Sequence, residues 1–311
     1  MVRYVQTDKK EGVVLLYLGL LLLAGILQGV MVSLNGQMGN YFSLFGICFF
    51  VHAIALVLLL AYLLAKRQTL RFAGAPWYVY LVGVMGIAIV ASSSWCTLHV
   101  GASAFMALST AGQLVSSALI DRFGLFGMPV TRIRKRQLPG YALVLLRASG
   151  RSELREGCKM IYYLTALING FFNSVNRMTN VRAGKLFGTA NGALINYVEA
   201  TVLSLLLMLV LKNGKELSWG YIVSVPWWVY LGSICGLLAQ LLQIVGTLRS
   251  NTLVSSILML AGNLGMSLTL DYVFYGTFSL LRAAGIFLIL AGMALVEKEK
   301  TAEAQTAAEE K

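Results

Sequence analysis

The stretch PWYVYLVGVMG at residues 76–86 returns as PWWVYLGSICG at residues 226–236, with six of the eleven positions identical. A second pair keeps the same offset of 150 residues: LSTAGQLVSSALID at 108–121 aligns with LMLAGNLGMSLTLD at 258–271, again with six identities. Both blocks lie within long apolar runs. The chain therefore contains one membrane unit written twice, a pattern typical of helix bundles built from internal repeats.

The composition is that of a membrane protein. Hydrophobic residues make up 58% of the chain and charged residues 12%, whereas soluble domains average roughly 45–50% and about 25%. The net charge of +12 comes from 25 Lys and Arg that stand in short gaps between apolar runs. Membrane orientation requires that placement, so we expect a lipid bilayer and no nucleic acid as partner. The four cysteines show no CxxC pair and no Cys/His spacing, so neither a disulfide framework nor a metal site is predicted.

Apolar runs long enough to cross a bilayer define the predicted helices, since a span needs about 20 apolar residues. They are 13–34, 43–65, 76–97 and 100–120 in the first copy, and 160–176, 187–211, 226–248, 251–270 and 278–296 in the second. A fifth helix of the first copy, at 137–146, has only ten residues before Arg147, so we expect a short or tilted span there. The predicted fold is an all-α integral membrane protein with about ten transmembrane helices in two five-helix repeats. Because each repeat holds an odd number of spans, the second should be inverted relative to the first.

The positive residues set the expected orientation. With ten spans and the N-terminus inside, eighteen of the 25 Lys and Arg fall in cytoplasmic segments, including Arg177, Arg182 and Lys185. Both termini are then cytoplasmic. The predicted organisation is an N-terminal cytoplasmic segment (1–12), a first repeat (13–150), a central loop (151–159), a second repeat (160–296) and a polar C-terminal tail (297–311).

Two ionisable residues stand at membrane depth, where every polar group needs a partner, a cavity or water. His52 lies midway along the second predicted helix and Glu199 within the seventh. Aligning VHA with VEA makes them counterparts in the two copies, at an offset of 147. Both side chains can bind and release protons. The alternative role is structural: His52 would donate to a backbone carbonyl, and Glu199 would pair with Asn196 or with a neighbouring helix.

Carboxamides form a second polar set. Gln28 and Asn35 near the end of the first helix align with Asn169 and Asn176 of the sixth at an offset of 141. Residues seven apart lie nearly two turns apart, so each pair shares a helix face. Such a face suits interhelical hydrogen bonds or the wall of a polar cavity. The candidate substrate- or ion-binding residues are Glu199, His52, Gln28, Asn35, Asn169, Asn173, Asn176, Gln240 and Gln243.

The fourth and ninth predicted helices carry AGQ at 111–113 and AGN at 261–263. Gly112 and Gly262 allow close backbone approach, and the neighbouring amides, of Gln113 and Asn263, are expected to bond across that contact. Asp121 and Asp271 close the same helices and are expected to act as anchors at headgroup level.

No catalytic constellation is present in the sequence. There is no GxSxG, Walker A or HExxH motif and no pair of carboxylates at membrane depth, so we expect neither an enzyme nor a cofactor. The missing P-loop also argues against an ATP-driven pump within this chain.

Two segments carry a family resemblance: QLVSSALIDRFGLFG (113–127) and INYVEATVLSLLL (195–207). Together with the two five-helix copies, they resemble the YdcZ-type branch of the drug/metabolite transporter superfamily over residues 13–296. The resemblance implies an EamA-like bundle of ten helices, inverted repeats, a central cavity and a multi-pass location in the bacterial plasma membrane. It also implies export or exchange of small metabolites or cationic compounds, often coupled to protons.

The expected function is alternating-access transport of a small polar or amphipathic solute. In it Glu199 is the coupling group and His52 its counterpart. Two rivals stay open: a non-transporting membrane scaffold with all polar groups paired, and a flippase for a lipid-linked carrier. The substrate, the direction of transport, the coupling ion and the oligomeric state, a homodimer included, are not determined by the sequence.

Overall fold

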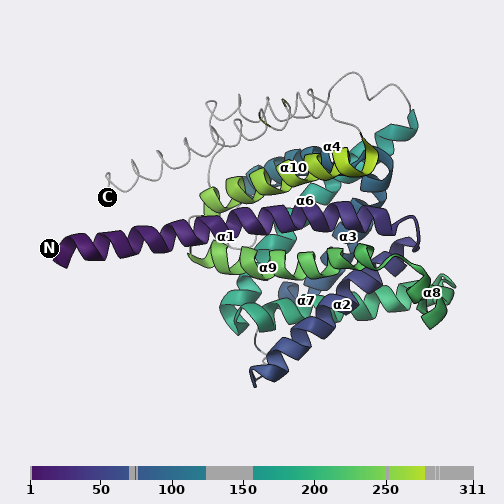
Figure 1. The fold of residues 1–311 in the computed structure, drawn as a ribbon, viewed down its shortest axis with the longest axis horizontal. Helices are drawn as coiled ribbons and strands as arrows, with labels where there is room; N and C mark the ends of the chain where they lie inside the picture. The colour runs from purple at the N-terminus through teal and green to yellow at the C-terminus, as the bar shows by residue number, and fades with distance from the viewer. Residues whose placement is uncertain are drawn as a thin grey trace.

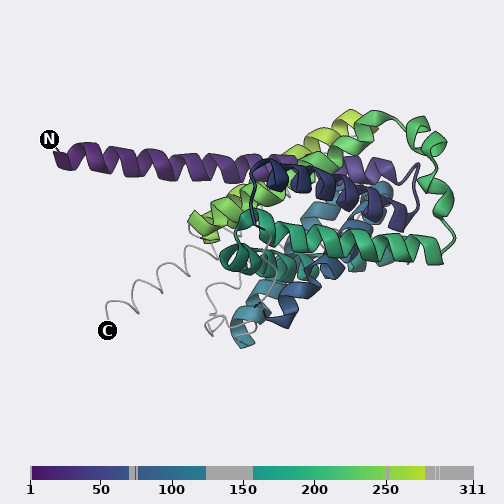
Figure 2. The same ribbon diagram turned by 90° about the horizontal axis from the view of Figure 1, so that it is seen from below.

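The computed structural model describes residues 2–69, 74, 76–123, 157–249, 252–276, 284 and 287. All the regular secondary structure in this part of the chain is helical (Figures 1 and 2). The long helices are α1 (Val2–Met38), α2 (Leu44–Ala65), α3 (Val82–Val100), α4 (Ala102–Phe123), α6 (Gly157–Phe187), α7 (Thr189–Val210), α9 (Leu231–Arg249) and α10 (Thr252–Tyr275). The short ones are α8 (Trp219–Ser224) and the 3-10 segments η1 (Trp77–Leu81), η4 (Gly214–Leu217) and η5 (Trp227–Tyr230).

The helices follow the predicted apolar runs closely from residue 44 to residue 123 and from residue 189 onward. Six helices in the described ranges are long and apolar enough to cross a membrane. The predicted fifth helix at 137–146 lies outside these ranges, as does nearly all of 278–296. Two helices extend well beyond the predicted runs: α1 begins at Val2 instead of near residue 13, and α6 continues to Phe187 instead of ending near residue 176. Arg177, Arg182 and Lys185 therefore belong to a helix and not to a loop.

Local sequence signals explain where helices begin and end. Ser43 caps α2, its hydroxyl accepting from the Gly46 N–H at 3.2 Å. Gly101 and Gly188 follow α3 and α6 with φ of 86° and 85°, a conformation that favours glycine and stops a helix. Pro76 and Pro226 precede η1 and η5, as their fixed φ predicts.

Glycines bring α1 and α10 together along parallel paths. A Cβ placed on Gly25 would lie 2.1 Å from the Met259 carbonyl oxygen, and one on Gly29 would lie 2.8 Å from that of Asn263. Contacting residue numbers rise together, so the two helices run in the same direction, as Figure 1 also shows. Gly262 lies in this crossing, as the sequence predicts.

The same arrangement joins α4 and α6. A Cβ on Gly112 would lie 2.1 Å from the Leu167 carbonyl oxygen, and the Ser174 hydroxyl donates to the Gln113 carbonyl at 3.2 Å. These two helices also run parallel. Close backbone approach of this kind is the usual way in which transmembrane helices pack, because lipid supplies no hydrophobic drive between them.

Carboxylates from the second half of the chain hold the starts of three helices in the first half. Asp271 at the end of α10 accepts from the backbone N–H groups of Ala102 and Ser103 at the start of α4, both at 2.9 Å, and from the Ser103 hydroxyl. Glu216 in η4 accepts from the Ser43 N–H at 2.8 Å and from its hydroxyl at 3.1 Å, just before α2. Glu199 on α7 accepts from the Gly83 N–H at 2.9 Å, at the start of α3. Helix N-termini carry unpaired N–H groups and partial positive charge, so each contact links the two halves favourably. Asp271 is buried, so the prediction of a headgroup-level anchor is wrong for it.

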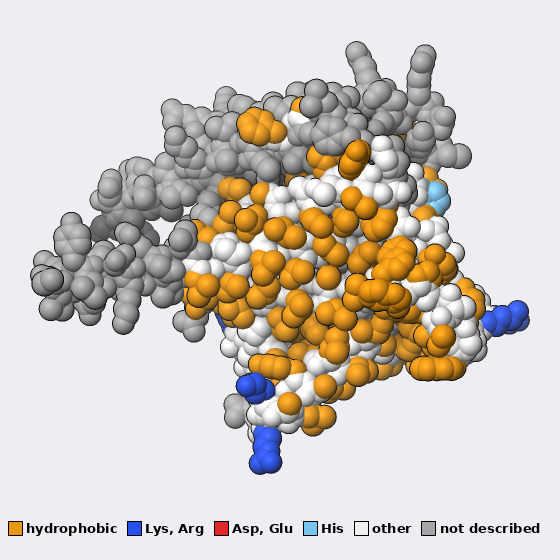
Figure 3. All heavy atoms as spheres, in the orientation of Figure 1, with side chains coloured by type: hydrophobic (Ala, Val, Ile, Leu, Met, Phe, Trp, Pro, Cys, Tyr) orange, Lys and Arg blue, Asp and Glu red, His pale blue; other side chains and the backbone are white. Residues whose placement is uncertain are grey.

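The surface of the bundle is apolar over a broad face. Figure 3 shows hydrophobic side chains covering most of the described surface on that side, with Lys and Arg only at its rim. Trp77 and Trp227 are each 74% exposed at the start of a span, where interfacial anchors are expected. Such a surface suits contact with lipid.

A candidate solute cavity between the two halves

A cavity of about 130 Å³ lies between helices of both halves. One water needs roughly 10–15 Å³ in the same kind of measure, so the space can hold a small solute. Its described lining comes from α1, α2, α3 and α4 on one side of the sequence and from α6, α7, α9 and α10 on the other. Nine carboxamide side chains line it: Gln28, Gln113, Asn173, Asn176, Asn180, Asn196, Gln240, Gln243 and Asn263.

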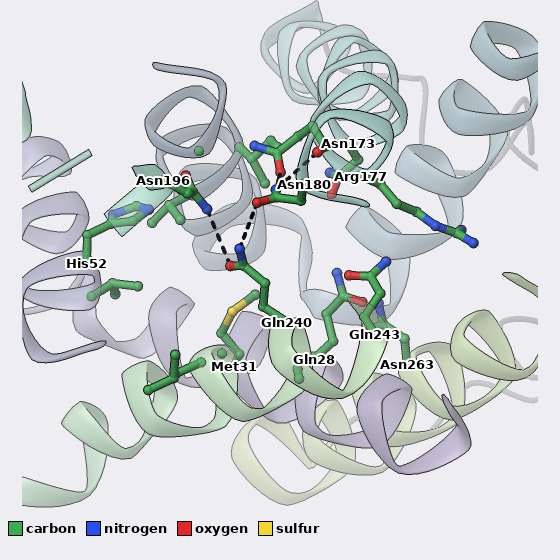
Figure 4. A pocket seen from close by; sticks show the side chains of 18 of the residues that line it. Gln28, Met31, His52, Asn173, Arg177, Asn180, Asn196, Gln240, Gln243 and Asn263 are labelled. Atoms are coloured by element: carbon green, nitrogen blue, oxygen red, sulfur yellow. Dashed lines mark hydrogen bonds between the residues drawn. The ribbon is translucent and has the colours of Figure 1, made fainter. Parts of the chain in front are cut away.

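Part of this lining is a chain of amide–amide hydrogen bonds, drawn with dashed lines in Figure 4. The Asn196 amide nitrogen donates to Gln240 Oε1 at 3.4 Å, and Gln240 Nε2 donates to Asn180 Oδ1 at 3.0 Å. Asn180 in turn donates to the Asn176 carbonyl at 3.0 Å and to its side-chain oxygen. The chain joins α7, α9 and α6 and holds these side chains in place along one wall.

Other polar groups of the lining have no partner among the described residues. Within the described part of the chain, the side-chain amides of Gln28, Gln113 and Gln243 make no hydrogen bond. Asn196 Oδ1 and the Ser233 hydroxyl are buried and also lack a partner there. Polar groups at this depth need a ligand or water to satisfy them. This wall therefore presents both donors and acceptors to whatever occupies the cavity.

Six of the nine predicted site residues line the cavity: Gln28, His52, Asn173, Asn176, Gln240 and Gln243. The His52 ring is buried, and its Nδ1 lies 2.7 Å from the Cys48 carbonyl on the preceding turn. That contact matches the structural alternative considered for His52. Its ring nonetheless belongs to the cavity wall, next to Asn196 in Figure 4.

The remaining three predicted residues are not among the lining side chains. Asn169 is buried behind Asn173, donating to the Ile89 carbonyl at 3.0 Å and accepting from the Ser109 hydroxyl at 2.9 Å. Asn35 is fully buried at the α1–α9 crossing, and neither of its amide atoms has a described partner. Glu199 is half-buried and directed at the start of α3, as described above.

Sequence reasoning missed Arg177 and Asn180 as lining residues, and it assigned Gln113, Asn196 and Asn263 to structural contacts. Arg177 was expected in a cytoplasmic loop, whereas α6 carries it into the cavity lining. A usable signal was available for α6: Asn169, Asn173, Asn176, Arg177 and Asn180 recur at helical spacing. In the described ranges, no group of three His, Cys, Asp or Glu side chains forms a candidate metal site.

Comparison with known proteins agrees with this architecture. The family model described as "Putative inner membrane exporter, YdcZ" matches residues 16–148 and again residues 161–295, which confirms the internal duplication and the resemblance seen in the sequence. A solved structure described only as "Crystal structure of protein" has a similar fold, with a TM-score of 0.60 and 18% identity over 90% of this chain and 94% of that chain. No curated protein matches the chain.

Proposed function

This chain belongs to the YdcZ family, and from that premise we propose that it moves a small polar solute out of the cell by alternating access. The family description and the apolar helices of the described ranges support a multi-pass inner membrane protein of exporter type. The cavity carries the rest of the proposal. A hydrogen-bonding chamber lined by both halves of a duplicated bundle is where solute sites of such transporters are expected.

The helix directions support an inverted relation between the two halves. By the repeat alignment, α6 is the counterpart of α1 and α4 that of α10. Helix α1 runs parallel to α10, and α6 runs parallel to α4. Because the end of α10 meets the start of α4 through Asp271, those two helices run in opposite directions, and so do α1 and α6. Halves related in this way can rock about a site between them and open it to either side in turn.

The roles follow from position. Gln28, Asn173, Asn176, Gln240 and Gln243 contact the solute with His52 at one end of the cavity, and Asn35 and Asn169 support the wall from behind. We assign the coupling role to Glu199, because its carboxylate accepts from the Gly83 N–H and so links α7 to the start of α3.

The test is thiol accessibility in membrane vesicles of both orientations. The substitution Gln243→Cys places a thiol in the cavity, in a background where Cys158 and Cys235 are replaced by alanine and the buried Cys48 and Cys96 are kept. We expect a membrane-impermeant thiol reagent to reach this thiol from both sides of the membrane, since alternating access exposes the cavity to each. Val57→Cys, on a side chain 65% exposed on the apolar surface, is the matched control and should stay unlabelled.

The outcomes separate the candidate functions. Reaction from both sides supports a carrier. Reaction from neither side contradicts the proposal and favours a scaffold whose polar groups are satisfied internally.

Proton coupling is a further part of the proposal and has its own measurement. With a transported solute in proteoliposomes, Glu199→Gln should reduce the dependence of uptake on a pH gradient, because glutamine cannot exchange a proton. The glutamine still offers an oxygen to the Gly83 N–H, so the helix contact is kept. An unchanged pH dependence would remove Glu199 from the coupling role.

A further inference from the structure

The hydrogen-bond chain along the cavity wall has a fixed direction. It ends at the Asn176 backbone carbonyl, which can only accept, so the Asn180 amide nitrogen donates to it and Asn180 Oδ1 is left to accept. Gln240 therefore donates from Nε2 to Asn180 and accepts through Oε1 from the Asn196 amide nitrogen. This order leaves Asn196 Oδ1 as an acceptor, buried and without a partner among the described residues.

The His52 ring brings a second acceptor to the same part of the cavity. Its Nδ1 lies 2.7 Å from the Cys48 carbonyl, which can only accept. An uncharged imidazole carries one N–H, so that hydrogen is on Nδ1, and Nε2 keeps its lone pair. Nε2 has no hydrogen-bond partner among the described residues. The side chains of His52 and Asn196 are only 3% and 4% exposed, so both acceptors are held in a buried site.

Gly86 on α3 provides the space that these two acceptors face. A Cβ built on this glycine would lie 2.8 Å from Asn196 Oδ1 and 3.3 Å from His52 Nε2. All three residues line the cavity, and Figure 4 shows His52 and Asn196 next to each other. Two acceptors from α2 and α7 thus lie within 3.3 Å of one point. Buried acceptors without partners are costly, so this point favours a ligand group that donates.

We propose that His52, Gly86 and Asn196 form a subsite for an –NH2 group, and that the solute is a small primary carboxamide. This inference deepens the proposed function and rests on it. The –NH2 of a carboxamide has two hydrogens and can donate to both acceptors at once, whereas a hydroxyl has only one hydrogen. The amides of Gln28 and Gln243, which make no hydrogen bond among the described residues, are available to the rest of the solute.

The counterpart position in the second repeat lacks such a pair of acceptors. Gly236 aligns with Gly86 at the offset of 150 and also lines the cavity. A Cβ on Gly236 would meet the side chain of Met31, whose Sδ would lie 2.7 Å away. The two glycines therefore present different chemistry to the cavity, and the –NH2 group is expected at Gly86 and not at Gly236.

The test compares two probes of nearly equal shape, isobutyramide and methyl isopropyl ketone, in which a methyl group replaces the –NH2. The full chain carries Ile89→Cys, at a cavity position three residues after Gly86, with Cys158 and Cys235 replaced by alanine. Each probe is titrated against labelling of this thiol by an impermeant methanethiosulfonate reagent in membrane vesicles. We expect the amide to halve the labelling rate at a concentration about ten-fold or more below that of the ketone, because the ketone leaves both acceptors unpaired.

Three variants locate the preference. Gly86→Ala places a methyl group between the two acceptors and should remove the difference between the probes. Gly236→Ala adds the same methyl group at the counterpart glycine, where the flexible Met31 side chain can move, and should keep the difference. His52→Phe keeps an aromatic ring without the Nε2 lone pair and should reduce the preference. The unfolding midpoint of each variant, measured in mixed micelles, shows that it folds.

The failure of this inference and that of the proposed function look different. An amide that protects no better than the ketone overturns the subsite, as does a preference that both Gly86→Ala and His52→Phe leave unchanged. An Ile89→Cys thiol that the reagent never reaches also overturns it, because solutes would then have no access to this part of the cavity. The transporter survives all three results as long as the Gln243→Cys thiol reacts from both sides. A Gln243→Cys thiol that reacts from neither side contradicts the transporter and the subsite together.

Discussion

The sharpest test of the packing compares one substitution at two glycines three residues apart on α10. Gly262 faces α1, where an added Cβ would lie 2.5 Å from the Leu22 carbonyl oxygen and 2.8 Å from the Ile26 nitrogen. Both atoms are backbone, so no side chain can turn aside. Gly265 faces outward, with nothing within 4 Å of an added Cβ. The two sites thus share a helix and differ in what the methyl group meets.

The magnitudes follow from this difference. Alanine gains about 0.5–1 kcal/mol over glycine in a helix, and this gain is common to both sites. At Gly262 the methyl group forces α1 and α10 apart, and overpacking of this kind costs about 1–3 kcal/mol. We therefore expect Gly265→Ala to stabilise the protein slightly and Gly262→Ala to destabilise it. The free-energy difference between the two variants isolates the steric cost.

The assay is reversible unfolding in mixed micelles, with an increasing mole fraction of dodecyl sulfate and helix content followed by circular dichroism. The midpoints of the two variants should move in opposite directions from the parent protein. Gly25→Ala tests the same crossing from α1, where the Met259 carbonyl oxygen would lie 2.1 Å away, and should behave like Gly262→Ala. Equal midpoints for Gly262→Ala and Gly265→Ala would refute the close approach of α1 and α10.

Three further predictions concern the links between the halves, the cavity and the topology. Asp271→Asn should destabilise the protein by about 2–3 kcal/mol, because it removes a charged acceptor from the start of α4. The control is Thr269→Ala, which removes an exposed hydroxyl bonded within its own helix and should change little in the same unfolding assay. Gln240→Leu should lower solute uptake at least ten-fold and the unfolding midpoint only slightly, because Asn196 and Asn180 lose the side chain that joins them. Uptake equal to that of Leu238→Ala, on the exposed face of the same helix, would contradict this role. Thiols introduced by Gln68→Cys and Lys212→Cys should be labelled from opposite sides of the membrane, and labelling of both from one side would contradict the inverted arrangement.

Much of the fold was readable from the amino-acid sequence. The 150-residue offset between 76–86 and 226–236 reveals the duplication, and the apolar runs place most helices to within a few residues, because lipid demands continuous apolar length whatever the packing. Gly112 and Gly262 were assigned to close crossings on the same grounds, since small residues are what transmembrane helices use there. The amides of Gln28, Asn173, Asn176, Gln240 and Gln243 stood out as cavity candidates because polar groups at that depth require partners.

Only the tertiary structure decided which way the charged side chains face. Hydropathy marks Glu199 as unusual, but the rotation of α7 against α3 turns it to the Gly83 N–H and away from the cavity. The same limit hid Arg177. Helix α6 continues to Phe187, and Asn176 and Asn180 in this part of it bond to α3 and α9, contacts that no local apolar pattern records. A sequence fixes how long a helix can be in lipid, whereas the partner on each face depends on residues more than a hundred positions away.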